Sequence, residues 1–113
     1  MEPREIVQAA IDAYHAHDLD TCLGFYAPNV VVKDASGKIL MNGTSEVRAR
    51  YAKSMSDHPK LHYDIPNRIA FGNWVVDEER ITGMSPPRDA EIARAILVYL
   101  LADGVIAEIT VFA

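Results

Sequence analysis

The sequence has one cysteine, no long apolar run and no cluster of basic residues, and each absence excludes a class of protein. The single cysteine, Cys22, excludes an internal disulfide, and its apolar neighbours are typical of a buried thiol rather than a nucleophile. No segment approaches the roughly 20 apolar residues that a membrane-spanning helix needs. Lysine and arginine are scattered and the formal net charge is −5, so binding to nucleic acid or to a membrane is not expected.

The length and the apolar content of the chain indicate one small folded domain. The 113 residues suffice for a single hydrophobic core but not for two, and half of them are apolar. We therefore expect residues 1–113 to form one domain. The acidic first segment lacks the basic stretch and apolar run of a signal peptide, which predicts a cytoplasmic location.

The first half of the chain carries helical patterns. Apolar residues recur at helical spacing over 6–14 and again over 19–26, which predicts two helices that form a hairpin. Thr44 or Ser45 is a candidate cap for a third helix, which Pro59 would end. Between the second and third helices, two apolar segments flank the letters "ASG", and this pattern predicts a short β-hairpin.

The second half carries strand patterns. Turn residues divide it into four strand-like segments, which predicts an antiparallel meander. Residues 89–102 are ambiguous, because good helix formers, a candidate cap at Asp89 and a terminating Gly104 favour a helix. The close Asp-Gly link to the β-branched segment 105–112 favours a strand buried on both faces, and we predict a strand.

Helices followed by a meander predict a segregated α+β fold. Three N-terminal helices would lie against one face of a curved antiparallel sheet, leaving a cone-shaped cavity. The opposite face would then expose apolar side chains of the segments "AILVYLL" and "VIAEITVFA". Exposed apolar patches of that size usually mark an interface, so we expect a homodimer that pairs sheet to sheet.

The stretch "DAYHAHDLDTCLGFYAPNVVVKD", residues 12–34, is similar to the opening segment of the nuclear transport factor 2-like superfamily. With the order of elements above, the whole chain resembles that group, and most closely its ketosteroid isomerases and SnoaL-like cyclases. The resemblance implies a cystatin-like α+β cone. It does not define one activity, because the scaffold carries isomerases, dehydratases, hydrolases, cyclases and non-enzymatic binders.

The resemblance also implies roles for individual residues. Asp34 falls at the position of the isomerase general base, and Tyr26 and Tyr51 match two tyrosines that support the oxyanion-stabilising tyrosine. The two oxyanion donors themselves align with Ala10 and Ile96, whose side chains cannot donate hydrogen bonds. Loss of one such donor typically costs about 100-fold to 1000-fold in rate, so the resemblance implies a poor steroid isomerase.

Two interpretations of Asp34 remain open. In an apolar pocket its pKa would be raised and it would act as an acid or base, whereas beside the "ASG" turn it would accept hydrogen bonds from the turn. Tyr14, Tyr26 and Tyr51 either pack in the core or reach the cavity. Tyr14, one turn along from Ala10, is a candidate substitute for the missing phenol donor.

Charged residues fall on both faces of the segment 74–83. Alternation places Asp77 and Glu79 on the same side as Val75 and Ile81. In the family alignment these two carboxylates match apolar pocket-lining positions, which indicates either a more polar pocket or a misaligned register. Cross-strand ion pairs are the alternative.

The histidines do not suggest a metal site. His15 and His17 are two residues apart, so on one helix they point in different directions, and we expect neither a metal nor a cofactor. His62 begins a predicted strand and is a candidate second acid or base beside Asp34.

Three functional hypotheses follow. The first is a cofactor-free isomerase or related lyase that acts on an apolar enolisable substrate, with Asp34 as base. The second is a non-catalytic domain that binds a small apolar metabolite in the same cavity. The third is an assembly role through the open face of the sheet.

Overall fold

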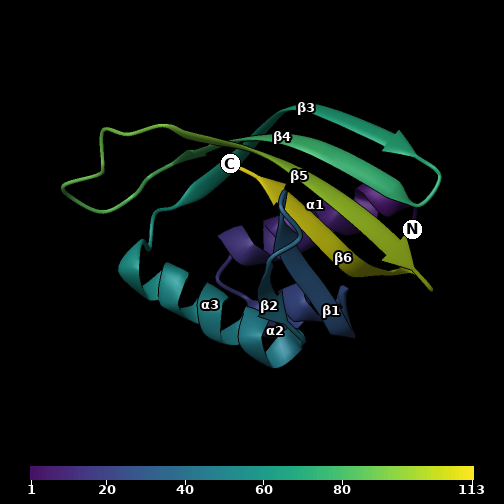
Figure 1. Ribbon diagram of the computed structural model, residues 1–113. Helices are drawn as coiled ribbons and strands as arrows, with labels where there is room; N and C mark the ends of the chain where they lie inside the picture. Colours follow the sequence, from purple (N-terminus) through teal and green to yellow (C-terminus); the bar gives the residue numbers. More distant parts are fainter.

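Three helices and one six-stranded sheet make up the fold (Figure 1). The computed structural model describes all residues, Met1–Ala113. The helices are α1 (Pro3–His15), α2 (Leu19–Leu23) and α3 (Thr44–Asp57). Gly43, rather than Thr44 or Ser45, caps α3, and the helix ends two residues before Pro59. No helix has the length and apolar character needed to cross a membrane.

The second helix is shorter than the sequence pattern predicts. It ends at Leu23, and Gly24, a poor helix former, follows it. Tyr26 was expected on this helix but begins a strand instead, where it is the partner of Ile106. The side chain of Tyr26 is buried all the same.

The sheet has the strand order β2-β1-β6-β5-β4-β3. Its strands are β1 (Tyr26–Asp34), β2 (Ile39–Asn42), β3 (His62–Phe71), β4 (Trp74–Thr82), β5 (Ala93–Ala102) and β6 (Val105–Phe112). Strands β3 to β6 form the predicted antiparallel meander, and the ambiguous segment is the strand β5. One pair departs from a purely antiparallel sheet, because β1 runs parallel to β6.

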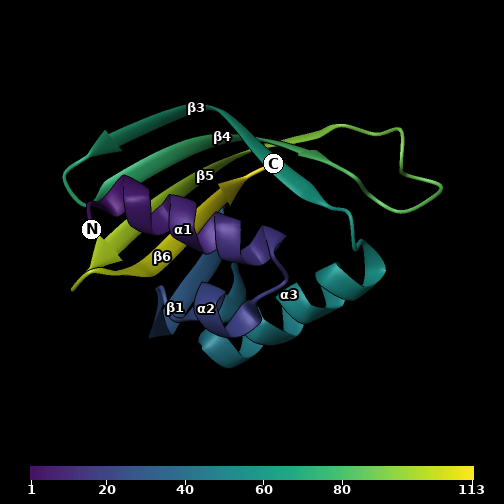
Figure 2. The same ribbon diagram turned by 180° about the vertical axis from the view of Figure 1, so that it is seen from behind.

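The helices occupy one side of the curved sheet. Seen from behind, α1 lies across β4 to β6, while in the opposite view no helix covers these strands (Figures 1 and 2). Val7 of α1, Val30 of β1, Val75 of β4 and Ile106 of β6 are all 0% exposed and meet between these layers. Burying each such side chain stabilises the fold by roughly 1.5–3 kcal/mol, which fixes α1 on the inner face.

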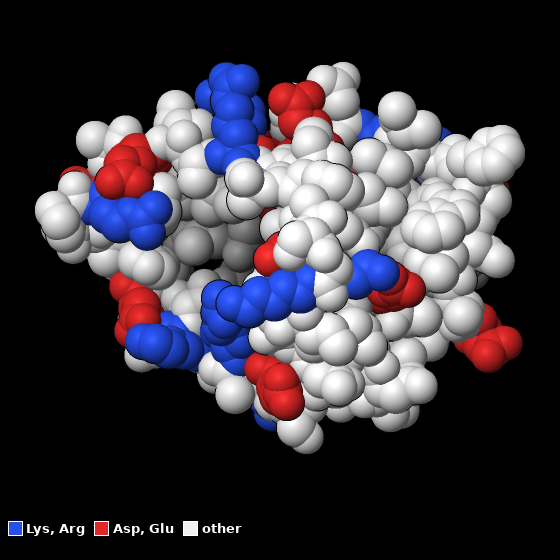
Figure 3. Space-filling model, viewed as in Figure 1, with Lys and Arg blue, Asp and Glu red and all other residues white.

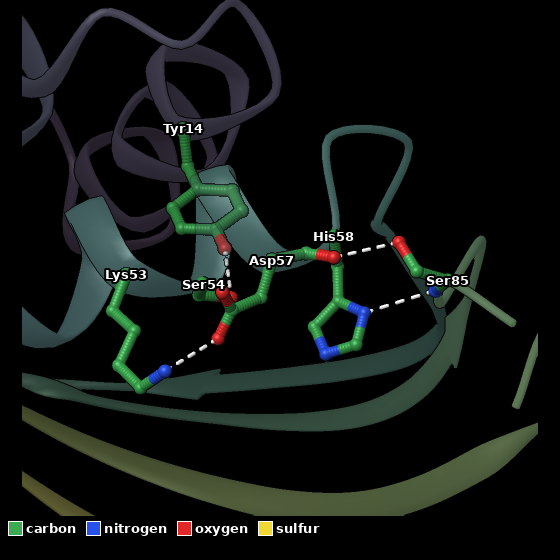
Figure 4. A network of polar contacts seen from close by, with 6 residues as sticks. All are labelled: Tyr14, Lys53, Ser54, Asp57, His58 and Ser85. Carbon is green, nitrogen blue, oxygen red and sulfur yellow. Dashed lines mark hydrogen bonds and ion pairs between the residues drawn. The ribbon is translucent and has the colours of Figure 1, made fainter.

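The loop between β4 and β5 is fastened to the C-terminal end of α3 (Figure 4). The backbone N–H of Ser85 donates to His58 Nδ1 at 2.9 Å, and Ser85 Oγ donates to the carbonyl of Asp57 at 2.6 Å. Gly83 starts the loop with φ +74°, where an added Cβ would lie 2.0 Å from the carbonyl oxygen of Lys60. Only glycine fits that position, and the contacts hold α3 beside the open end of the sheet.

Candidate functional site

A cavity of about 390 Å³ lies between the inner face of the sheet, α1 and α3. This is within the range of roughly 300–1,000 Å³ that is typical of small-molecule sites. Of its 21 lining residues 18 are hydrophobic, and they come from both layers of the fold. Figure 3 shows a hollow on the face above α3, where these elements meet. The structure therefore contains an apolar site large enough for a small organic molecule.

Glu79 is the one acidic residue that lines this cavity. Alternation along β4 turns it inward with Val75 and Asp77, and only 4% of it is exposed. It takes part in no hydrogen bond or ion pair within the protein. Burial raises the pKa of Glu79 to about 7, the negative charge of Asp77 adds to the rise, and Arg68 opposes it. Glu79 is therefore about half protonated near neutral pH, and its carboxyl group faces an apolar cavity.

All five tyrosines of the chain line the same cavity. Tyr14 bonds Ser54 Oγ at 2.7 Å, as Figure 4 shows, and the hydroxyls of Tyr26 and Tyr51 lie 2.9 Å apart. The Tyr14 ring packs edge-on against Tyr51 and Tyr63, at centroid distances of 5.3 and 5.2 Å. Five helices and strands thus contribute phenol groups to one space, and Tyr14, Tyr26 and Tyr51 are among the residues that line it.

Four of the tyrosine hydroxyls have a raised pKa and so remain protonated over the ordinary pH range. Burial is the main cause that raises the pKa of Tyr26, Tyr51, Tyr63 and Tyr99, and the negative charge of Glu79 adds to it for the last three. A protonated phenol donates a hydrogen bond, so these groups can stabilise an anionic oxygen on a bound molecule. The sequence interpretation missed Tyr63 and Tyr99, which the inward alternation of β3 and β5 places here.

Asp77, the neighbour of Glu79 on the inner face, has a structural role. It is 0% exposed, and Arg68 of the adjacent strand holds both of its oxygens, with Nε–Oδ1 at 2.6 Å and Nη2–Oδ2 at 2.9 Å. Arg68 also donates from Nη1 to Gln8 Oε1 of α1 at 2.9 Å. Asp77 therefore forms a cross-strand ion pair, whereas Glu79 adds a polar group to the cavity.

Asp34 lies outside the cavity, contrary to the expectation from the family alignment. Its carboxylate accepts hydrogen bonds from Ser36 N at 2.9 Å, Ser36 Oγ at 2.6 Å and Lys38 N at 3.1 Å. The hydrogen bond from the Ser36 side chain is the main cause that lowers the pKa of Asp34. Such a carboxylate is a poor proton acceptor at neutral pH, and it caps the turn that follows β1.

The aligned position Ile96 also faces away from the cavity. It is 38% exposed on the outer face, where it is the partner of Glu78, whereas its neighbours Ala95 and Leu97 line the cavity. The alignment is therefore displaced by one residue on β5, since adjacent residues point to opposite faces. Ala10 does line the cavity, and neither position supplies a donor.

His62 lies on the surface rather than in the cavity. Its ring stacks on His15 with centroids 4.2 Å apart, and its Nε2 is 3.1 Å from Asp64 Oδ1. His15 Nε2 accepts a hydrogen bond from the backbone N–H of Tyr63 at 2.9 Å, and burial together with His62 lowers the pKa of His15. This pair orients the start of β3, and neither ring is hydrogen-bonded to Asp34. The described residues include no group of three or more His, Cys, Asp or Glu side chains arranged to hold a metal.

Glu79 is expected to make the fold less stable as the pH rises. Its pKa is 4.5 ordinarily and about 7 when folded, so between these values the folded chain holds a proton that the unfolded chain has released. Protonated Glu79 therefore favours the folded chain by about 3 kcal/mol below the unfolded pKa of 4.5, and this contribution is lost as the pH rises to the folded pKa of about 7. Urea unfolding of the wild type and Glu79→Gln at about pH 4 and about pH 8 measures it. An equal difference between the two proteins at both pH values would contradict the assignment.

Comparison with known proteins is consistent with this architecture. The model of the SnoaL-like domain matches residues 7–109, so the chain belongs to the SnoaL-like domain family. No curated protein matches the sequence.

Solved structures show the same fold at low sequence identity. An uncharacterised cystatin-fold protein from Novosphingobium aromaticivorans is 21% identical with a TM-score of 0.90, over 100% of this chain and 99% of that one. A nuclear transport factor 2-like protein of unknown function from Cytophaga hutchinsonii is 19% identical with a TM-score of 0.80, over 99% and 89%. A protein from Catenulispora acidiphila with a ketosteroid isomerase-like fold, in complex with trimethylamine, is 17% identical with a TM-score of 0.77, over 96% and 85%. The α+β cone is thereby confirmed.

Proposed function

We propose that the chain binds a small, largely apolar molecule in the cavity and moves a proton on it with Glu79. The observation that carries the proposal is the position of this carboxyl group, which is 4% exposed, unpaired and directed into an apolar cavity with a pKa of about 7. A general base works best when its pKa lies near the operating pH. Glu79 meets this condition, while the exposed turn residue Asp34 does not.

The proposed reaction is a proton shift next to a carbonyl group. Ionised Glu79 removes a proton from the carbon beside the carbonyl, the C–H electron pair forms an enolate, and a tyrosine hydroxyl donates a hydrogen bond to the enolate oxygen. Glu79 then returns a proton either to the same carbon, after its carboxyl proton has been replaced by one from solvent, or to a conjugated carbon. The first outcome is exchange and the second is isomerisation, which makes the chain an isomerase of enolisable ketones.

The proton transfer is measurable without knowledge of the natural substrate. An apolar aryl ketone, 1-tetralone, is incubated with the protein in D₂O and its deuterium content is followed by mass spectrometry. The proposal predicts exchange faster than in buffer and faster than with a heat-denatured sample. Exchange at the buffer rate, with the ketone bound according to calorimetry, would contradict the catalytic role.

The predominance of apolar side chains among the lining residues favours a second candidate function, the non-catalytic binding of an apolar metabolite. Such a protein needs the cavity but no proton transfer. It would bind the ketone without incorporating deuterium, and detection of deuterium in the ketone would exclude this alternative.

We also propose that two copies pair through the outer face of the sheet. Ile69, Phe71, Trp74, Ile96 and Phe112 all project from that face and are exposed. Figures 1 and 3 show that no helix covers these strands and that much of the surface over them is uncharged. Contiguous apolar surface of this kind is typical of an interface.

The pairing predicts a change of mass in solution. Light scattering at micromolar concentration should give a dimer for the wild type and a monomer for Ile96→Arg, because the new charge lies at the centre of the outer face. Ile92→Arg is the matched control, since Ile92 is exposed on the loop before β5 and should leave the dimer intact. A monomeric wild type, or a dimeric Ile96→Arg, would refute the pairing.

A further inference from the structure

The arginines of this acidic chain divide into two groups. The chain has seven arginines, and four of them form ion pairs with carboxylates. The paired arginines are Arg4, Arg48, Arg68 and Arg88. Arg50, Arg80 and Arg94 have no acidic partner, although the net charge of −5 means that carboxylates are in excess.

Two of the three arginines without a partner line the cavity, and the third lies beside one of them. Arg50 of α3 and Arg94 of β5 both line it. Alternation places Arg80 of β4 and Arg94, its direct partner in the sheet, on the outer side of their strands, so Arg94 meets the cavity at its rim, near the start of β5. The Nε of Arg80 is buried with no hydrogen-bond partner. Figure 3 shows basic side chains above and below the hollow. Like charges directly opposite each other destabilise a strand pair, so this arrangement costs free energy unless an anion binds beside it.

We propose that the ligand of this cavity carries a carboxylate, which Arg50 and Arg94 bind at the mouth while its apolar body fills the interior. Guanidinium groups bind carboxylates through paired, charge-assisted hydrogen bonds, and Arg80 adds positive charge on the strand next to Arg94. Glu79 inside the cavity fixes the orientation, because its negative charge disfavours a second carboxylate there. The substrate class is therefore an amphipathic carboxylic acid, and the inference rests on the proposed function only in using the same cavity.

The test compares two probes that differ in charge but hardly in shape. 2-Naphthoate carries a carboxylate, and 2-naphthamide is its uncharged counterpart. Calorimetry on the wild type should show the carboxylate binding at least about tenfold more tightly, as charge-assisted hydrogen bonds predict. In the double variant Arg50→Gln, Arg94→Gln the two affinities should become nearly equal while that of the amide is unchanged.

Arg48→Gln is the matched control. Arg48 lies on the same helix as Arg50, but its ion pair is with Asp20 outside the cavity, so the preference for the carboxylate should remain. Equal affinities in the wild type, or a preference that survives the double variant, would overturn the carboxylate assignment alone. Failure of both probes to bind at millimolar concentration would overturn it together with the proposed binding function. Because no turnover is measured, a carboxylate preference without deuterium exchange would leave this inference standing and refute only the catalytic proposal.

Discussion

Glu79→Gln is expected to slow deuterium exchange into 1-tetralone by about 100-fold to 10,000-fold, the usual contribution of a positioned general base. Glutamine keeps the size and polarity of the side chain and removes only its capacity to accept a proton. The cavity, the tyrosine hydroxyls and the affinity for the ketone should therefore be retained. The measurement is the exchange rate at saturating ketone, followed by mass spectrometry.

Asp34→Asn is the control for that result. This carboxylate lies outside the cavity and accepts hydrogen bonds from its own turn, so its replacement should leave the exchange rate unchanged and cost only local stability. If instead Asp34→Asn abolished exchange and Glu79→Gln retained it, the proton would be moved at the end of β1 and the present assignment would be wrong.

Arg68→Met is expected to lower the free energy of unfolding by about 3–5 kcal/mol, because it leaves a buried charge without its partner. Asp77 is 0% exposed and depends on Arg68 for both of its ion-pair contacts. The same substitution removes the contact from Arg68 to Gln8 that joins β3 to α1. Urea unfolding at neutral pH measures the loss.

Two further variants separate the ion pair from general effects of the substitution. Arg88→Met breaks an exposed pair with Glu91 and should cost no more than about 1 kcal/mol. The combination Arg68→Met, Asp77→Leu removes both buried charges and should recover much of the lost stability, since apolar replacement of a buried pair is often neutral or better. An Arg68→Met protein as stable as Arg88→Met would show that Asp77 does not need its partner.

Much of the fold was predictable because it depends on the spacing of apolar residues and on the residues that form turns. The meander follows from Gly, Asp-Gly and Pro-Pro turns, and the strand at Ala93–Ala102 follows from its short link to β6, which outweighed its helix-forming residues. The inward side of β4 was also predictable, since alternation alone places Asp77 and Glu79 beside Val75. The chain's membership of the SnoaL-like family agrees with the resemblance identified in the sequence.

The proposed proton-transfer residue was not predictable, because its position depends on contacts across the fold. Asp34 and Glu79 are both carboxylates in or beside apolar segments. They differ because Asp34 accepts three hydrogen bonds from its turn, whereas Glu79 is buried on the inner face of β4. The error at Ile96 has a similar origin, because a displacement of one residue reverses the face of a strand. Tyr63 and Tyr99 join the site through the pairing of β3, β4 and β5, which no local pattern reveals.

The most direct test of the account is the titration of the Glu79 carboxyl group itself. Carbon-13 NMR of glutamate-labelled protein follows the side-chain carboxyl signals with pH, and the signal missing from Glu79→Gln identifies the residue. The account predicts a midpoint near 7, because burial and Asp77 both oppose ionisation. A midpoint near the ordinary value of 4.5 would show that Glu79 is well solvated or paired, and would contradict its role as the proton-transfer group of the cavity.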